Sequence, residues 1–302
     1  MLKPLALIAL PVLLLGLTAC DPGSRDPASD GRVHIVASTN VYGDLARQVA
    51  GDDAEITSII DDPAQDPHEF EASPRVQLAL SEADIVIVNG GGYDDFMRTM
   101  LDAAGNGDVI VIDVVAISGL DAAAEGFNEH VWYNYDVMTR LVTQLASDLQ
   151  KVDPDNLSLY AIAKSDVTSE LDSLSSTAAD ARDTVAGAGV VITEPVPLYL
   201  LDAMGFENLT PPDFSEAIEQ DSDIPPALLQ SVLNLLGDGS AALVAYNAQT
   251  GGPQTDAVID AATENGVPAV AVTETLPTGM HYVAWQRGLQ ESFLSAVEQG
   301  IG

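Results

Sequence analysis

Two of the four histidines in the chain stand in polar loops that also carry carboxylates. His68 lies in residues 66–71 (DPHEFE), where Pro67 restricts the backbone and presents the ring from a stiff turn. His130 lies in residues 128–132 (NEHVW), just before an expected helix. A neutral imidazole nitrogen is a common ligand of divalent transition metals, so both rings are candidate metal ligands.

Two glutamates stand directly behind apolar runs that read as strands. Glu194 follows residues 190–193, and Glu274 follows residues 270–273. Ligands of open α/β sheets bind at the carboxyl ends of the strands. Imidazole nitrogens from the first half and carboxylate oxygens from the second half suit a divalent metal. Taken singly, each of these four side chains also fits a solvated surface position.

The remaining two histidines are interpreted as structural or surface residues. His34 lies inside the first expected strand, as a packed or edge residue. His281 is expected on the surface near the start of the last helix, although it follows Glu274 by only seven residues.

Short β-branched runs alternate with helical patterns in both halves of the chain. We expect strands at 33–37, 54–60, 85–88, 109–112, 190–193, 242–246 and 269–273, and helices at 41–49, 76–82, 96–104, 198–204, 255–265 and 282–299. Continuous apolar strands separated by helices predict parallel sheets covered on both faces. The fold class is therefore α/β, with two parallel-sheet domains.

Residues 135–187, between the two halves, have little strand character. One helix is expected at 136–149, and Pro154 is expected in the first turn of another, where proline is tolerated. The second helix would have ~30 residues and a length of about 45 Å. We expect an N-terminal domain at 33–150, a linking helix at 151–188 and a C-terminal domain at 189–302.

The chain is strongly acidic, with 46 aspartates and glutamates, 11 lysines and arginines, and a net charge of −35 over 302 residues. So few cations cannot form a basic patch, which excludes nucleic acid and an anionic membrane surface as partners. The acidity is typical of a solvated surface in high salt or outside the cell. A single cysteine, Cys20, excludes an internal disulfide and a cysteine-rich metal site.

Residues 1–19 are predicted to be an export signal, with Lys3 before an apolar run at 5–17. The run ends in the letters LTAC at 17–20, which resemble a bacterial lipobox. We therefore expect lipid on the thiol of Cys20 and a flexible tether at 20–32 that anchors a soluble body to the outer face of the cell membrane.

Residues 33–302 resemble the solute-binding proteins of zinc and manganese ABC importers, the TroA-like family. The first ligand motif of that family matches residues 66–71 closely, and residues 128–132 resemble the second, with Glu129 in place of a proline. The resemblance implies four metal ligands: His68, His130, Glu194 and Glu274, the last replacing the usual aspartate. It also implies two domains bridged by one rigid long helix, with the metal in the cleft between them.

The function implied is capture of Zn²⁺ or Mn²⁺ and its delivery to an ABC permease by a monomeric receptor that is not an enzyme. Two nitrogens and two carboxylates do not decide between the two metals, and they also suit Fe²⁺. A receptor for an organic metal chelate is one alternative, disfavoured by few aromatic and basic residues. A metallohydrolase is another, but HExxH and GxSxG motifs are absent from the sequence.

Overall fold

The computed structural model describes residues 31–62, 67, 70, 73–185 and 187–300. The described residues from Val33 onward form one compact unit, and of residues 1–32 only Gly31 and Arg32 are described. The predicted export signal, Cys20 and His68 lie outside the described residues. Among the helices of the described part, none combines the length and the apolar character that crossing a bilayer requires.

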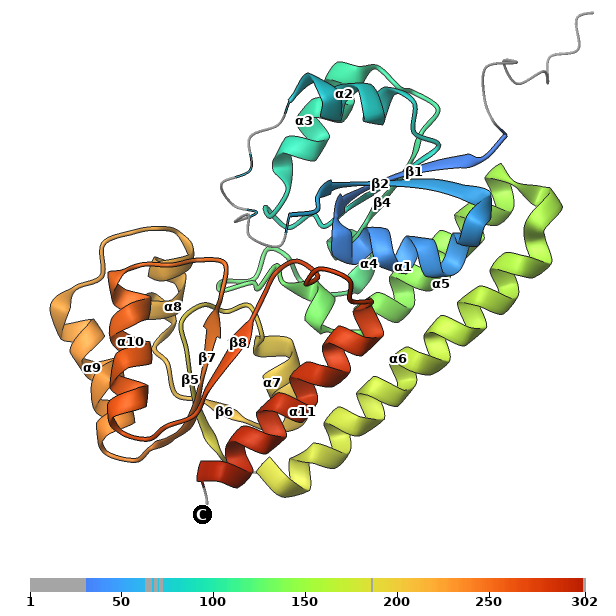
Figure 1. The fold of residues 1–302 in the computed structure, drawn as a ribbon. Coiled ribbons are helices and arrows are strands. Elements are labelled where there is room, and N and C mark those ends of the chain that lie inside the picture. The colour runs from blue at the N-terminus through green and yellow to red at the C-terminus, as the bar shows by residue number, and fades with distance from the viewer. Residues whose placement is uncertain (1–30, 63–66, 68–69, 71–72, 186, 301–302) are drawn as a thin grey trace, which may run out of the picture. The chain divides into compact units, whose positions relative to one another are not determined.

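The first sheet is fully parallel and has the strand order β2-β1-β3-β4 (Figure 1). Its strands are β1 (Val33–Thr39), β2 (Ala54–Ile60), β3 (Ile85–Val88) and β4 (Ile110–Asp113). Its helices are α1 (Asn40–Ala50), α2 (Pro74–Ser81), α3 (Asp95–Ala104) and α4 (Val114–Ser118), with a short 3-10 turn η1 (Gly51–Asp53) before β2.

Alternate residues of β1 and β3 enter two different cores, as the two-residue period of a strand requires. Ile35 and Ile85 belong to the large core with α1 and α4, whereas Val36 and Val86 belong to a smaller core under α2 and α3. Both faces of the sheet are thus covered, and β3 is buried along its whole length.

The second sheet is also parallel and has the strand order β6-β5-β7-β8. Its strands are β5 (Gly189–Ile192), β6 (Glu207–Asn208), β7 (Ala241–Asn247) and β8 (Ala269–Val272). Its helices are α7 (Leu198–Met204), α8 (Pro212–Glu219), α9 (Pro226–Gly237), α10 (Pro253–Glu264) and α11 (Tyr282–Gly300). Val190 faces the core with α7 and α11, and Val191 faces the core under α8, α9 and α10 (Figure 1).

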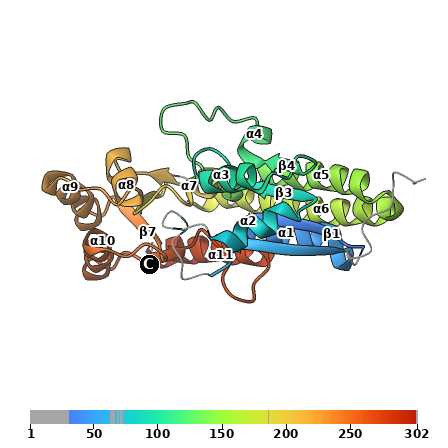
Figure 2. The same ribbon diagram turned by 90° about the horizontal axis from the view of Figure 1, so that it is seen from above.

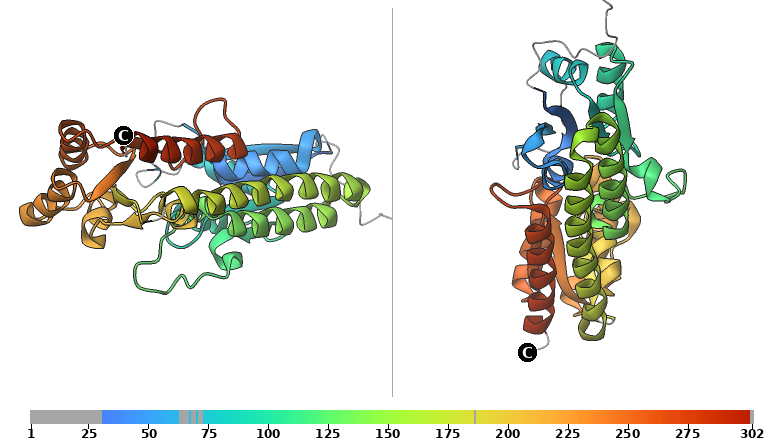
Figure 3. Two further views of the ribbon diagram at one scale, coloured as in Figure 1. Left: turned by 90° about the horizontal axis from the view of Figure 1, so that it is seen from below. Right: turned by 90° about the vertical axis from the view of Figure 1, so that its right-hand side faces the viewer.

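Two long helices follow the first sheet. They are α5 (Tyr135–Val152) and α6 (Leu157–Val185), joined by the 3-10 turn η4 (Pro154–Asn156). They run side by side, and α6 contacts α1 of the first domain and α7 and α11 of the second (Figures 2 and 3). Pro154 was expected in the first turn of the second helix; it begins the 3-10 turn η4, which leads directly into the 29-residue α6.

The predicted fold class is confirmed: two parallel-sheet α/β domains are joined by one long helix. The sequence analysis did not predict α4, β6, α8 or α9. Proline stands at the first position of both α8 and α9, where its missing N–H costs nothing. That signal, with Phe214 and Ile218 four residues apart on the buried face of α8, would have located this helix.

The buried face of α6 yields a test of its role in the fold. Leu171→Ala should lower the free energy of unfolding of the metal-free protein by about 2–5 kcal/mol, because Leu171 is fully buried and truncation leaves a cavity. Ile162→Ala on the same helix, at a side chain 64% exposed, should change it by less than about 0.5 kcal/mol. Urea denaturation followed by circular dichroism measures both; equal effects would mean that α6 is not held by this face.

Candidate metal-binding site

His130 is completely buried in the loop before the 3-10 turn η3 (Val131–Tyr133). Its Nδ1 lies 2.6 Å from Asn128 Oδ1, and its backbone N–H donates to the same oxygen at 3.1 Å. Asn128 Nδ2 in turn donates to the carbonyl of Pro195 at 2.9 Å, which fixes the amide orientation. An acceptor at Nδ1 assigns the ring proton to that nitrogen, so Nε2 carries the lone pair that binds a metal.

Glu194 and Glu274 come from the second domain and are also buried. Glu194 follows β5 by two residues, and Glu274 follows β8 by two residues. Asn247, the last residue of β7, lies between them: its Nδ2 donates to Glu194 Oε2 at 2.7 Å and to Glu274 Oε1 at 2.8 Å. Three neighbouring strand ends therefore bring both carboxylates to one place, as the strand-end rule predicts.

The two domains meet at Glu274. Nε2 of His130 lies 3.9 Å from Glu274 Oε2. The hydroxyl of Tyr93, in the loop before α3, donates to the same carboxylate oxygen at 3.0 Å. The ring of His130 packs edge-on against Trp132 and Tyr93, with centroids 5.1 and 6.1 Å apart. These contacts hold the imidazole and Glu274 facing each other.

The structure adds a residue that the sequence analysis missed. Glu219, the last residue of α8, places Oε1 3.4 Å from His130 Nε2, and its side chain is only 9% exposed. One ligand atom each of Glu129, His130 and Glu219 lie within 4.8 Å of one another. Burial raises the pKa of Glu219 to about 9, with further contributions from the negative charges of four glutamates: Glu129, Glu194, Glu274 and Glu216.

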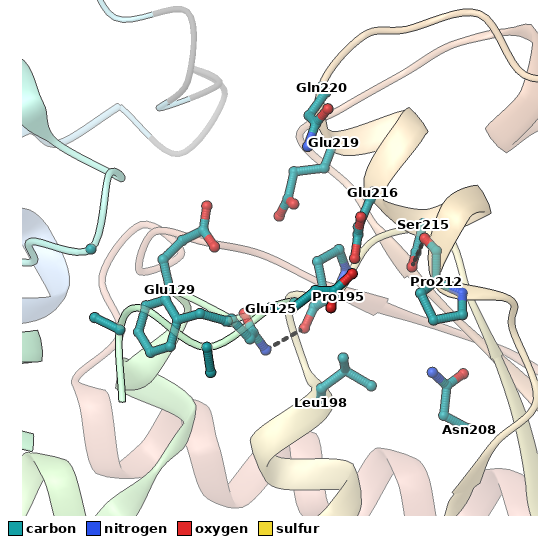
Figure 4. Close-up of a pocket in the computed structure, with 16 residues that line it drawn as sticks. Glu125, Glu129, Pro195, Leu198, Asn208, Pro212, Ser215, Glu216, Glu219 and Gln220 are labelled. Atoms are coloured by element: carbon teal, nitrogen blue, oxygen red, sulfur yellow. Dashed lines mark hydrogen bonds between the residues drawn. The ribbon is translucent and has the colours of Figure 1, made fainter. Parts of the chain in front are cut away.

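A cavity of about 610 Å³ adjoins this cluster (Figure 4). Four glutamates are among its lining residues: Glu125, Glu129, Glu216 and Glu219. In Figure 4 the carboxylates of Glu129 and Glu219 point toward the same space from opposite sides. The approach to the buried imidazole is therefore strongly acidic, which favours cations.

Among the sequence-predicted ligands, His130, Glu194 and Glu274 are brought together, and His68 lies outside the described residues. His281 directly precedes α11, with a side chain 73% exposed and Nδ1 2.7 Å from Asp44 Oδ1 on α1. His34 lies in β1. The chemistry of the cluster, an imidazole nitrogen with several buried carboxylate oxygens, fits a divalent transition metal.

The raised pKa of Glu219 predicts the effect of neutralising it. In the folded chain Glu219 keeps its proton, whereas in the unfolded chain it loses the proton near the usual pKa of 4.5. The tighter binding of this proton stabilises the folded state, and the stabilisation is complete below pH 4.5. It is lost as the pH rises toward about 9. Glutamine suffers no such loss, so Glu219→Gln should stabilise the metal-free protein increasingly from about pH 5 to pH 9.

Thermal unfolding of the metal-free protein over this pH range measures the difference. We expect a gain of at least about 1 kcal/mol at the alkaline end, or roughly 2–4 °C in Tm. A Tm difference that does not change with pH would contradict the assigned burial of this carboxyl.

The family described as "Zinc-uptake complex component A periplasmic" matches residues 35–296 of the chain. A relative named "Manganese-binding lipoprotein MntA", from Halalkalibacterium halodurans, is 24% identical over 241 residues, covering 74% of this chain and 80% of the relative. The "Manganese ABC transporter substrate-binding lipoprotein PsaA" of Streptococcus mitis is 30% identical over 169 residues. That second match spans 52% of this chain and only 54% of the streptococcal protein.

Solved structures agree with the fold. The periplasmic zinc-binding protein TroA from Treponema pallidum superposes with a TM-score of 0.72 at 17% identity, covering 88% of this chain and 99% of that one. The binding protein FpvC from Pseudomonas aeruginosa, solved with Mn²⁺, also gives a TM-score of 0.72, at 19% identity over 88% of this chain and 98% of that one. Because the family match covers most of the sequence, the chain belongs to the family of periplasmic zinc-uptake component A proteins.

Proposed function

We propose that this protein is the extracytoplasmic receptor of an ABC importer, and that it captures Zn²⁺ or Mn²⁺ and delivers the ion to a membrane permease. The observation that carries the proposal is the buried meeting of His130 with Glu274, which come from different domains. Membership of the family supports the same function, as do the relatives named as manganese-binding or zinc-binding proteins.

The proposed ligands are His68, His130, Glu194 and Glu274. Asn128 orients the imidazole of His130, and Asn247 holds the two carboxylates at a fixed separation. Such supporting contacts set the direction of each ligand and keep the correct atom facing the metal. Because the ligands bind the ion in their deprotonated forms, affinity should fall as the pH drops through the histidine range.

The proposed ligands come from both domains, so binding of the ion depends on the relative position of the two domains. The long helix α6 contacts both domains, and several hydrogen bonds also cross between them. These connections favour small adjustments over a wide hinge motion on binding and release.

We propose that residues 1–19 are an export signal, that Cys20 carries the lipid anchor and that residues 20–32 tether the body to the cell surface. The relatives named lipoproteins support the anchor. The body would divide into the domains 33–150 and 189–302 with the linking segment 151–188, and would work as a monomer and as a receptor, not an enzyme. The net charge of −35 supports the absence of nucleic acid among its partners.

The first test is a calorimetric titration of the chelator-stripped mature chain, residues 20–302, with Zn²⁺ and separately with Mn²⁺. We expect tight 1:1 binding by the natural sequence and a loss of at least about 100-fold in His130→Ala, since a buried ligand is removed. His281→Ala, which removes an exposed imidazole, should bind as the natural sequence does.

Two outcomes would contradict the proposal at different levels. Unchanged affinity in His130→Ala would remove this residue from the site. Binding of neither metal by the natural sequence would leave an organic metal chelate as the remaining cargo to test.

The metal preference should depend on Glu194. Replacing this carboxylate by an imidazole in Glu194→His should raise the ratio of Zn²⁺ to Mn²⁺ affinity at least about tenfold, because nitrogen ligands suit Zn²⁺ and oxygen ligands suit Mn²⁺. The matched control is Glu207→His, the same exchange at an exposed position on β6. Equal ratios in both variants would argue against Glu194 as a ligand.

A further inference from the structure

We propose that Glu219 binds the captured ion directly, as a third carboxylate ligand that favours Mn²⁺ over Zn²⁺. The inference rests on the proposed function, because it assigns a further ligand and a preferred metal to the same site. Neither the sequence motifs nor the four-ligand set that they imply includes this residue.

The separation of the atoms fits ligands of one ion. Two ligand atoms that each lie about 2.1 Å from a metal, at angles between 90° and 109°, are about 3.0–3.4 Å apart. Oε1 of Glu219 lies 3.4 Å from Nε2 of His130, and the other ring nitrogen, Nδ1, faces Asn128. An ion bound to Nε2 would therefore have Glu219 within coordinating distance.

The environment of Glu219 also favours a bound cation. Its Oε1 is buried and accepts no hydrogen bond from the part of the chain that the structure describes. The charges that face it from other elements are those of Glu129 on the loop before η3, Glu194 after β5 and Glu274 after β8. A buried carboxylate oxygen without a donor, close to other carboxylates, is costly, and a divalent ion coordinated by the group would remove that cost.

Glu219 lies where the cavity meets the buried imidazole. It lines the cavity together with Glu125, Glu129 and Glu216 (Figure 4). Its Oε1 also lies 3.4 Å from Nε2 of His130, which is completely buried. A cation that enters through the cavity would encounter this carboxylate before it reaches the ring of His130. Glu219 is thus positioned both to receive the ion and to remain bound to it.

A third carboxylate changes the expected metal. Zn²⁺ in proteins is mostly four-coordinate and is commonly bound by nitrogen and sulfur ligands. Mn²⁺ prefers six ligands that are mainly oxygens. With Glu219 the proposed carboxylate ligands number three, and the donor set of the described residues, one imidazole nitrogen and three carboxylates, is dominated by oxygen.

The experiment compares Glu219→Gln with Glu216→Gln in the mature chain, residues 20–302. Both residues lie on α8 and line the same cavity, but Glu216 is not part of the group formed by Glu129, His130 and Glu219. Calorimetric titration with MnCl₂ and with ZnCl₂ gives two dissociation constants for each variant. We expect Glu219→Gln to weaken Mn²⁺ binding at least about tenfold and Zn²⁺ binding less than about threefold. Glu216→Gln should leave the ratio of the two constants unchanged.

The outcomes separate this inference from the proposed function. If the natural sequence binds metal, His130→Ala loses it and Glu219→Gln binds as tightly as the natural sequence does, the inference is overturned and the receptor function stands. Equal weakening of both metals in Glu219→Gln would overturn the assigned preference. If the natural sequence binds neither metal, the proposed function itself fails.

A purely structural role for Glu219 is distinguishable as well. Circular dichroism of the metal-free variant should show the native fold with a Tm at least as high as that of the natural sequence. Weaker Mn²⁺ binding accompanied by a lower Tm would indicate damage to α8 and overturn the direct role of Glu219.

Discussion

The organising constraint of this molecule is a concentration of carboxyl groups in its interior. Glu274 is buried beside the imidazole of His130, Glu194 is buried on the other side of the Asn247 amide, and the side chain of Glu219 is 9% exposed. Carboxylates in so dry a place repel one another and lose their hydration, a cost that the protein must offset by donors, by protons or by a bound cation. Asn247 and Tyr93 donate to Glu274, whereas Oε1 of Glu219 is buried and accepts no hydrogen bond within the described part of the chain.

Parallel sheets make this concentration of carboxyl groups possible. The strands β5, β7 and β8 all end at one edge, so the residues that follow them converge without a long excursion of the chain. The first domain contributes loops that are themselves fixed by hydrogen bonds. Asn89, directly after β3, donates to the carbonyl of Glu129 at 3.0 Å, and Asp94 accepts from the backbone of Asn89 at 2.6 Å. The imidazole is therefore held by the sheet beneath it through a short chain of bonds.

Direct hydrogen bonds between the two domains keep the halves of the site in register. Asn40 and Leu276 exchange two bonds, of 3.1 and 2.8 Å, and Tyr133 donates to the carbonyl of Thr273 at 2.7 Å, next to Glu274. Tyr282 donates to the carbonyl of Trp132 at 2.6 Å, two residues from His130. With α6 packed along both domains, these bonds make the cleft a nearly preformed site, which lowers the ordering cost of binding.

Local sequence was sufficient for seven of the eight described strands and for the long helix. Apolar runs such as residues 85–88 form strands through their own side chains, and Glu194 and Glu274 are placed by the strands that they follow. His68 remains a prediction because it lies outside the described residues. The position of Glu219 beside His130 depends on the tertiary structure alone. Nothing near it in the sequence marks a ligand; it reaches His130 only because α8 packs on the second sheet and ends beside a loop of the first domain.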